Sequence, residues 1–314
     1  MPDRIKLGYL LPTREQIMEG RPETGPLLEL ATQAEASGFD SIWVGDSLLA
    51  RPRHDPLTLL AAVAGRLPRV EVGTAVLLPA LRNPVLLAHQ VATLDQISEG
   101  RLILGVGIAA DTASIRAEFL AAGVPFEKRV GRMMEGLRLC RALWTGEPVD
   151  WQGRWEVKQG VLAPTPFRPD GPPLWIGGNL QASLDRAARS FDGWFPIAPD
   201  PATFATQWSG IQEAARMLGR DADRLTGAMY LTVALDDNAA HAEDRLNRFL
   251  ERYYNQPAPV LRRRQACYAG PEAGLAEWLS SYANAGASHL MLRFAGEHER
   301  QMAALARIMP SILS

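Results

Sequence analysis

Side chains that could transfer protons or orient a ligand follow an apolar segment near the start of the chain. The segment SIWVG runs directly into Asp46 and Ser47. The loop behind them contains Arg51, Arg53 and His54. Histidine titrates near neutral pH, and carboxylates and hydroxyls can hold or pass a proton. We therefore predict catalytic roles for Asp46, Ser47 and His54, and we expect the two arginines to contact the substrate.

A second group of interest is the glycine pair in WIGGNLQAS. The pair lies between an apolar, strand-like segment and a helical one. Backbone N–H groups at the start of a helix, approached closely through glycine, suit a phosphate group. We expect Gly177, Gly178 and Asn179 to bind the phosphate of a cofactor. The alternative is that the glycines only permit a tight turn.

Other motifs with known chemistry are weak in this sequence. GVGIAA at 105–110 fits the dinucleotide pattern, but that pattern needs a first strand-to-helix unit and an acid at the end of the next strand. None of the five histidines stands in a metal-ligand pair, and Cys140 and Cys267 lack a nearby partner. We therefore expect no metal site, no disulfide framework and no Rossmann fingerprint. The slim residues of GVGIAA suit a flat ligand ring.

Composition narrows the classes of partner and location. The 314 residues are 47% apolar and 22% charged, with a formal net charge of −2. Basic residues are not concentrated in one region, which argues against a nucleic-acid partner. The sequence contains no 18-residue apolar run and shows no signal peptide before its first strand, so we expect a cytoplasmic protein with no membrane contact.

The elements that must position these residues alternate along the chain. In the first third, strands start about every 30 residues, which is the length of one βα unit. Helix 84–98 shows a clear signature, with Asn83 as its cap and Pro84 at its first position. Segments such as LILGV are continuously apolar, as strands of a parallel sheet are. The expected strands are 5–11, 39–46, 70–78, 102–107, 174–178, 193–197, 227–235 and 288–294.

Eight strands followed by helices predict a (β/α)₈ TIM barrel. We expect a single domain over residues 1–314, with insertions after the fourth and seventh strand units. The first insertion contains a hairpin at WQGRWEV, and the second lies near 255–270. A doubly wound sheet is the alternative, but it requires a reversal of strand order that the sequence does not show.

A TIM barrel carries its working groups at the carboxyl ends of its strands. This rule adds further residues to the prediction. We expect Pro12, Asp111, Trp194 and Arg293 to line the substrate side together with the arginines of the first loop. Thr74, Ala75, Val76, Gly107 and Ile108 also end strands. The segment 12–25 is expected to act as a lid.

Three long segments carry a resemblance to a known family: GFDSIWVGDSLLARPRHDPLTLLAAVAGR, VEVGTAVLLPALRNPVLLAHQVATLDQISEGRLILGVG and PPLWIGGNLQASLDRAARSFDGWFPI. They resemble the bacterial luciferase-like oxidoreductases, which use reduced FMN with oxygen or the deazaflavin coenzyme F-420. The resemblance implies a ring at the barrel mouth and a bulge with a non-prolyl cis peptide around Thr74, Ala75 and Val76. It implies further cofactor contacts at Gly107 and Ile108, and a phosphate at Gly177, Gly178 and Asn179.

The sequence departs from the family pattern at two positions. Ser47 stands where luciferases and several deazaflavin enzymes have a histidine near the reactive ring. Ile108 stands where some FMN enzymes have a basic residue for the phosphate. Both departures bear on how a proton is moved and on which cofactor is bound.

These observations lead to one main expectation and three alternatives. The main expectation is a monooxygenase that uses reduced FMN and oxygen on a small organic substrate. The first alternative is a hydride-transfer oxidoreductase that uses coenzyme F-420, and the second is a flavin-binding protein without turnover. A metal-dependent barrel hydrolase is disfavoured by the histidine spacing. The resemblance also implies a homodimer and, as a possible partner, a separate flavin reductase.

Overall fold

The computed structural model describes residues 4–313. Eight parallel strands close into a barrel, in the order β9-β11-β1-β2-β3-β4-β7-β8, with β8 pairing back to β9. This closure confirms the predicted (β/α)₈ barrel and excludes the open, doubly wound sheet. The strands are β1 (Lys6–Leu10), β2 (Ser41–Val44), β3 (Glu71–Thr74), β4 (Leu102–Val106), β7 (Leu174–Ile176), β8 (Gly193–Trp194), β9 (Thr226–Leu235) and β11 (His289–Phe294).

Several of the described helices start after a residue whose side chain caps them. Asn83 accepts hydrogen bonds from the backbone N–H groups of Val85 and Leu86, as predicted, and Asp55 does the same for Thr58. The helices are α1 (Thr13–Met18), α2 (Gly25–Ala36), α3 (Pro56–Arg66), α4 (Pro84–Ile97), α5 (Ala113–Ala121), α6 (Arg129–Trp144), α7 (Gln181–Ser190), α8 (Pro201–Met217), α9 (Ala239–Tyr254), α10 (Ala258–Arg262), α11 (Glu272–Asn284) and α12 (His298–Leu313). Three short 3₁₀ helices cover Pro79–Leu81, Phe126–Lys128 and Ala222–Arg224.

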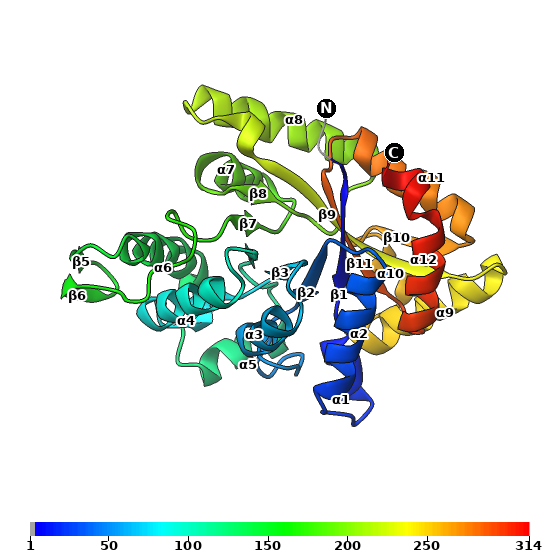
Figure 1. Ribbon diagram of the computed structural model, residues 1–314, viewed down its shortest axis with the longest axis horizontal. Coiled ribbons are helices and arrows are strands. Elements are labelled where there is room, and N and C mark those ends of the chain that lie inside the picture. The colour runs from blue at the N-terminus through cyan, green and yellow to red at the C-terminus, as the bar shows by residue number, and fades with distance from the viewer. Residues whose placement is uncertain (1–3, 314) are drawn as a thin grey trace. The chain divides into compact units, whose positions relative to one another are not determined.

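The described residues form two compact units. Among residues 4–313, the terminal unit comprises 4–15, 23–43 and 175–313, and the central unit comprises Gln16–Pro22 and Val44–Leu174. In the terminal unit, β1, β11 and β9 lie side by side, and α2, α12 and α11 pack outside them (Figure 1).

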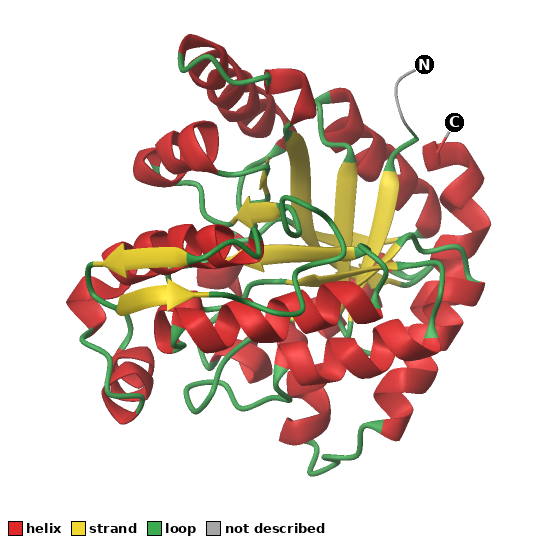
Figure 2. Ribbon diagram, turned by 60° about the vertical axis from the view of Figure 1, so that its left-hand side comes forward, coloured by secondary structure: helices red, strands yellow, loops and turns green. Residues whose placement is uncertain are grey.

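The first insertion is an antiparallel hairpin in the central unit, formed by β5 (Val149–Gln152) and β6 (Glu156–Gly160), as predicted. Figure 2 shows its two strands as a separate ribbon beside a helix. The hairpin is held on α6, because Glu135 accepts a hydrogen bond from the backbone N–H of Arg154 (2.6 Å) and pairs with its guanidinium. The guanidinium of Arg132 lies 4.9 Å from the ring of Trp155.

The second insertion is longer than the sequence indicates. It runs from α9 through α10 to β10 (Cys267–Gly270), a short strand that pairs with the carboxyl end of β9, Cys267 beside Thr232. The helix that packs against α8 and α12 in the outer ring is α11. The prediction placed the insertion near 255–270 because the amphipathic pattern of α9 is that of an ordinary barrel helix. Because β10 pairs with β9 and the next helix, α11, packs in the outer ring, α9 belongs to the insertion.

A buried histidine lies at the amino-terminal end of β11 in the terminal unit. His289 packs edge-on against Trp43 and Trp175, with ring centroids 5.5 and 5.2 Å away. The indole N–H of Trp43 donates to Ser41 Oγ, which lies 2.7 Å from His289 Nε2. The serine hydroxyl therefore donates to Nε2, and the imidazole is neutral. Burial, assisted by the nearby charge of Lys6, lowers the pKa of His289 to about 3.

We expect this histidine to make the fold acid-sensitive. The unfolded chain binds a proton at His289 below pH 6.5, whereas the folded protein does so only near pH 3. The free energy of unfolding is therefore not reduced by His289 above pH 6.5. As the pH is lowered from 6.5 towards 3, the free energy of unfolding falls by up to about 1.4 kcal/mol per pH unit. Urea unfolding between pH 7.5 and 4.5 should show a shallower pH dependence for His289→Gln than for the wild type. The same slope in both proteins would contradict this, and His241→Gln, at an exposed position, is the control.

Candidate functional site

In the central unit, Asp46 is held in a buried ion pair. Its carboxylate accepts two hydrogen bonds from the Arg82 guanidinium and one from the backbone N–H of Leu78 (2.9 Å). The Asp46 side chain is 1% exposed and that of Arg82 is 14% exposed. Burial lowers the pKa of Arg82, but the charges of Asp46 and Asp55 outweigh it and raise that pKa above its ordinary value. Asp46 thus fixes the segment after β3, and it is engaged with Arg82 rather than with Arg51.

Ser47 lies in a second buried network, around Glu118 of α5. Its hydroxyl donates to Glu118 Oε2 (2.8 Å) and accepts from the backbone N–H of Arg51 (2.9 Å). The same carboxylate oxygen accepts the N–H groups of Leu49 and Ala50 at 2.8 and 2.6 Å. Glu118 is 1% exposed, and its Oε1 is buried with no hydrogen-bond partner. This carboxylate fixes the whole turn after β2.

Sequence reasoning missed Glu118. A signal existed, because Glu118 lies on the same face of α5 as Ile115, and that face is buried. A charged residue on the apolar face of a helix needs a partner, and here the partner is the loop that carries Ser47. The pattern alone did not say which loop that was.

The predicted basic residues of this loop, Arg51, Arg53 and His54, are half-buried. Arg53 donates from Nε to the carbonyl of Arg51 (3.2 Å), and its guanidinium occupies the space that a side chain at Gly45 would need. His54 Nε2 lies 2.9 Å from the carbonyl of Pro22, so this nitrogen carries the hydrogen and donates it. The loop that holds the predicted basic residues is therefore joined to the segment 16–22.

Around β3 and β4, the residues expected to contact a cofactor ring lie together. The Ala75–Val76 peptide is cis, as expected. Thr74 is buried and donates from Oγ1 to the carbonyl of Gly105 (2.7 Å). A Cβ added to Gly107 would lie 2.5 Å from Cγ2 of Val76, so this close approach requires glycine. Ala75 and Val76 are only half-buried.

Ile108 and Asp111 follow β4 but are engaged elsewhere. The carbonyl of Ile108 accepts a hydrogen bond from Arg129 Nε (2.9 Å). Asp111 is exposed and forms a two-point ion pair with Arg116, at 2.7 and 2.8 Å, which lowers the pKa of this carboxyl. Asp111 is therefore paired with a residue of α5. This ion pair does not bring Asp111 into contact with Ser47 or Asp46.

In the terminal unit, the glycine turn between β7 and α7 is open to solvent. Gly178 has a φ of +100° and is exposed, as is Asn179. No side chain caps the amino-terminal end of α7 at Leu180. The carbonyl of Gly178 accepts a hydrogen bond from the indole of Trp194 (2.7 Å). This geometry leaves the amino-terminal end of α7 available to an anion.

Trp194 does not occupy the substrate-lining position that the sequence suggested. It is fully buried and stacks on Phe204, with ring centroids 5.1 Å apart. Its one polar atom is used to hold Gly178. Trp194 is therefore a positioning residue for the glycine turn.

Pro12 and Arg293 are also buried in the terminal unit. Pro12 directly precedes α1, so the segment expected to be a lid loop starts with a short helix. Arg293, near the carboxyl end of β11, donates hydrogen bonds to Tyr254, Thr232 and Gln265. The sequence pattern of β11 did not indicate these three partners of Arg293.

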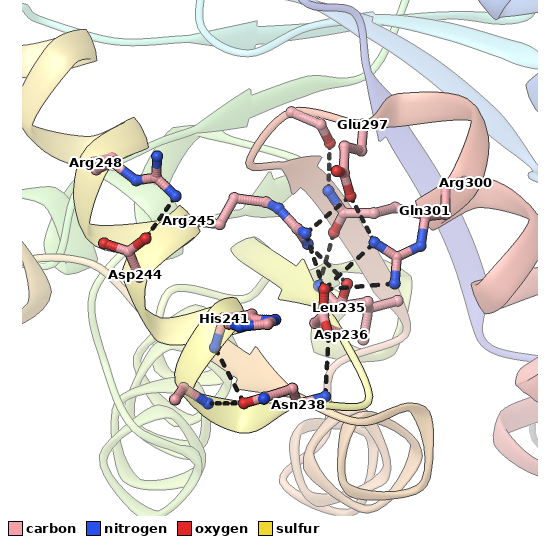
Figure 3. Close-up of polar contacts among 12 residues, drawn as sticks. Leu235, Asp236, Asn238, His241, Asp244, Arg245, Arg248, Glu297, Arg300 and Gln301 are labelled. Carbon is pink, nitrogen blue, oxygen red and sulfur yellow. Dashed lines mark hydrogen bonds and ion pairs between the residues drawn. The ribbon is translucent and has the colours of Figure 1, made fainter.

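A polar network closes the loops after β9 and β11 in the terminal unit (Figure 3). Arg245 pairs with Asp236 at 2.9 Å and with Glu297 at 3.0 Å, and Arg300 pairs with Glu297 at 2.8 Å. Gln301 Oε1 accepts the backbone N–H of Leu235 (2.9 Å). The network contains equal numbers of acids and arginines, so it adds no net charge at this end of the strands.

Two kinds of site find no support in the part of the chain that the structure describes. No group of three or more histidine, cysteine or acidic residues is arranged to hold a metal ion among residues 4–313. Within the same residues, no helix is long and apolar enough to cross a membrane.

Comparison with known proteins gives consistent matches. A family model described as luciferase-like monooxygenase matches residues 5–306. An F-420-dependent glucose-6-phosphate dehydrogenase of Tsukamurella paurometabola is 28% identical, over 95% of this chain and 94% of its own. The enzyme of the same name from Nakamurella multipartita is 33% identical, over 77% of this chain and 71% of its own.

Solved structures agree in fold. An F-420-dependent secondary alcohol dehydrogenase, in complex with an F-420–acetone adduct, superimposes with a TM-score of 0.83 at 21% identity, over 99% of this chain and 100% of that chain. A monooxygenase of Streptomyces bottropensis gives 0.81 at 22% identity, over 98% and 99%. At these identities the matches support the barrel architecture.

The Asp46–Arg82 pair leads to a stability prediction. Asp46→Ala would leave the Arg82 guanidinium and the Leu78 N–H buried without their main partner. We expect the free energy of unfolding to fall by about 3 kcal/mol, as when one member of a buried pair is removed. Urea unfolding measures this loss. Asp111→Ala removes an exposed carboxylate from an arginine and should change little, so equal losses in the two variants would contradict the assignment.

Proposed function

The chain belongs to the luciferase-like monooxygenase family, and we propose that it is an oxidoreductase that binds coenzyme F-420 and transfers a hydride between it and a small organic substrate. The observation that carries this proposal is the nature of the relatives. The two curated enzymes named above are F-420-dependent dehydrogenases, one of them 33% identical over 77% of this chain. The monooxygenase with reduced FMN, which the sequence placed first, is supported by the family description but not by these relatives.

The residues around β3 and β4 fit a flat ring. We propose that Ala75, Val76 and Ile108, which are half-buried, contact one side of it. Gly107 permits this surface because it lets Val76 approach the backbone, and Thr74 fixes the backbone through Gly105. When bound, F-420 exchanges a hydride at C5 of its ring and, lacking N5, reacts poorly with oxygen.

The glycine turn of the terminal unit fits the cofactor's phosphate. Gly177, Gly178 and Asn179 precede α7, whose first N–H groups have no side-chain cap. The positive end of a helix dipole favours an anion there. Trp194 keeps the turn in place by its bond to the Gly178 carbonyl. We propose that the phosphate of the cofactor binds at this turn.

We propose that Ser47 and Glu118 move the proton that accompanies hydride transfer. The Ser47 hydroxyl already donates to Glu118 and accepts from the Arg51 N–H, which leaves one lone pair for a substrate hydroxyl. A proton from the substrate would pass to Ser47 while the serine proton passes to Glu118. Asp46 supports this loop region through Arg82, and Arg51, Arg53 and His54 are proposed substrate contacts. The homodimer and a separate reductase remain predictions from the family resemblance.

Cofactor binding tests the proposal directly. Fluorescence titration should show micromolar binding of F-420 and at least tenfold weaker binding of FMN in either redox state. Gly178→Ala should weaken F-420 binding by about tenfold or more, because the φ of +100° is strained for alanine and the new Cβ would lie 2.9 Å from Ser183 Oγ. Gly219→Ala is the matched control: its φ is +75°, and no atom lies within 4 Å of the added Cβ.

The titration also separates the alternatives. Preferential binding of reduced FMN would favour a monooxygenase that uses reduced FMN and oxygen over the proposed F-420-dependent enzyme. Binding of neither cofactor by folded protein would contradict the proposal. Tight binding of F-420 without turnover of any alcohol or carbonyl substrate would favour the non-catalytic alternative.

The proton relay has its own test. Ser47→Ala should lower the rate of F-420 reduction by about 100-fold, the lower end of what one proton-transferring group contributes, with no change in F-420 affinity. Stopped-flow absorbance at the deazaflavin band measures this with the best substrate of an alcohol panel. Unchanged rates would show that Ser47 does not carry the proton. Thr112→Ala, which alters the start of α5 without touching Glu118, is the control.

A further inference from the structure

Arg293 lies at an unusual place for a buried charge. It pairs in register with Thr232 of β9, one residue before the end of β11. Side chains alternate along a strand, so Arg293 lies on the same face as His289, opposite the face on which Phe294 contacts His298 of α12. Arg293 thus points to the inner side of the strands, at the end where barrel enzymes bind their ligands.

The polar partners of Arg293 are all neutral. The guanidinium donates to Tyr254 Oη at 2.8 Å, Thr232 Oγ1 at 2.8 Å and Gln265 Oε1 at 2.7 Å. Its Nε is buried without any hydrogen-bond partner, and the whole side chain is 1% exposed. Four aromatic rings surround it, with centroids 5.0–5.4 Å from its central carbon: Tyr230, Phe249, Tyr253 and Tyr254.

No carboxylate forms an ion pair with Arg293 among the described residues. Glu243, which like Arg293 lies near Cys267, pairs with Arg262. Glu15 acts electrostatically on Tyr230 but does not pair with Arg293. Burial raises the pKa of Tyr230 far above 10, so this ring is not a counter-charge. The charge of Arg293 is therefore desolvated and stabilised by neutral acceptors and ring faces, without a carboxylate in direct contact, and a ligand anion would supply the missing counter-charge.

The surrounding walls come from the second insertion. Phe249, Tyr253 and Tyr254 belong to α9, and Gln265 directly precedes the strand β10. Tyr254 and Phe249 are half-buried, so they form the side of the cage nearest to solvent. Because this insertion is not needed to complete the barrel, its aromatic lining around one cation points to recognition of a ligand.

We propose that Arg293, Tyr254 and Gln265 form a subsite for a single carboxylate of the substrate. The inference rests on the proposed function and extends it, because it makes the substrate an organic acid that also carries the oxidisable or reducible group. One guanidinium with one N–H group left without a partner matches one negative charge. A planar carboxylate suits a guanidinium edge, and the free Nε–H supplies a donor for it.

Ligand-dependent stability tests this without any turnover. The probes are sodium propionate and its neutral analogue propionamide, at constant ionic strength. For the wild type, propionate should raise the melting temperature saturably, by about 3 °C at tenfold above its Kd, and propionamide should not. Arg293→Gln should lose the effect, and Arg293→Lys should keep it at higher propionate concentrations. Arg248→Gln, at an exposed arginine of α9, should behave as the wild type does.

Each other outcome would overturn the assignment. A wild type that responds equally to propionate and propionamide lacks the subsite, whether or not the variants fold. A propionate response retained in Arg293→Gln places the anion elsewhere. A response to inorganic phosphate or glucose 6-phosphate that exceeds the response to propionate excludes the carboxylate class.

A parallel titration of F-420 distinguishes the two sources of an anion. If the substrate supplies the carboxylate, Arg293→Gln should bind F-420 within twofold of the wild type. A loss of tenfold or more would instead assign Arg293 to the anionic part of the cofactor and overturn the substrate subsite. Failure of the wild type to bind F-420, combined with a propionate response that requires Arg293, would remove the proposed cofactor and leave the anion site in place.

Discussion

Burial of charge at the carboxyl ends of the strands is the constraint on which the candidate site depends. In the central unit this constraint is met inside the protein: Asp46 and Arg82 neutralise each other, and Glu118 accepts three hydrogen bonds from the loop after β2. A buried ion is tolerated when its charge and its hydrogen bonds are both satisfied. These two networks therefore fix the loops that carry Ser47 and the half-buried strand end at Ala75 and Val76.

The terminal unit meets the same constraint differently. Its outer network of Asp236, Arg245, Glu297 and Arg300 is internally neutral, while Arg293 is surrounded only by neutral acceptors and rings. Hydrogen bonds and ring faces stabilise this buried cation, but among the described residues no carboxylate pairs with it. Asp46 has a counter-charge in Arg82, whereas Arg293 has only neutral partners, and this contrast supports the proposal that Arg293 serves a ligand.

Local patterns made much of this predictable. The cap at Asn83, the hairpin at WQGRWEV and the glycine turn at Gly178 all appear where the sequence placed them. Helix periodicity also explains why the second insertion starts earlier than the sequence indicated, since α9 carries the pattern of a barrel helix although it belongs to the insertion. Glu118 and the true position of Trp194 were beyond local patterns, because a buried polar group is recognised only through its distant partner.

The sequence by itself determined the kind of architecture, the family and the loops in which chemistry is expected. The architecture and the loops follow from short-range patterns of apolar, capping and glycine residues, which each segment carries on its own, and the family follows from the resemblance of three long segments. Only the tertiary structure decided that Asp46 pairs with Arg82, that Ser47 is bonded to Glu118 and that Arg293 has no acidic partner. Pairings between residues 36 to 71 positions apart depend on how the closed barrel aligns its strand ends, and the packing of the whole fold sets that alignment.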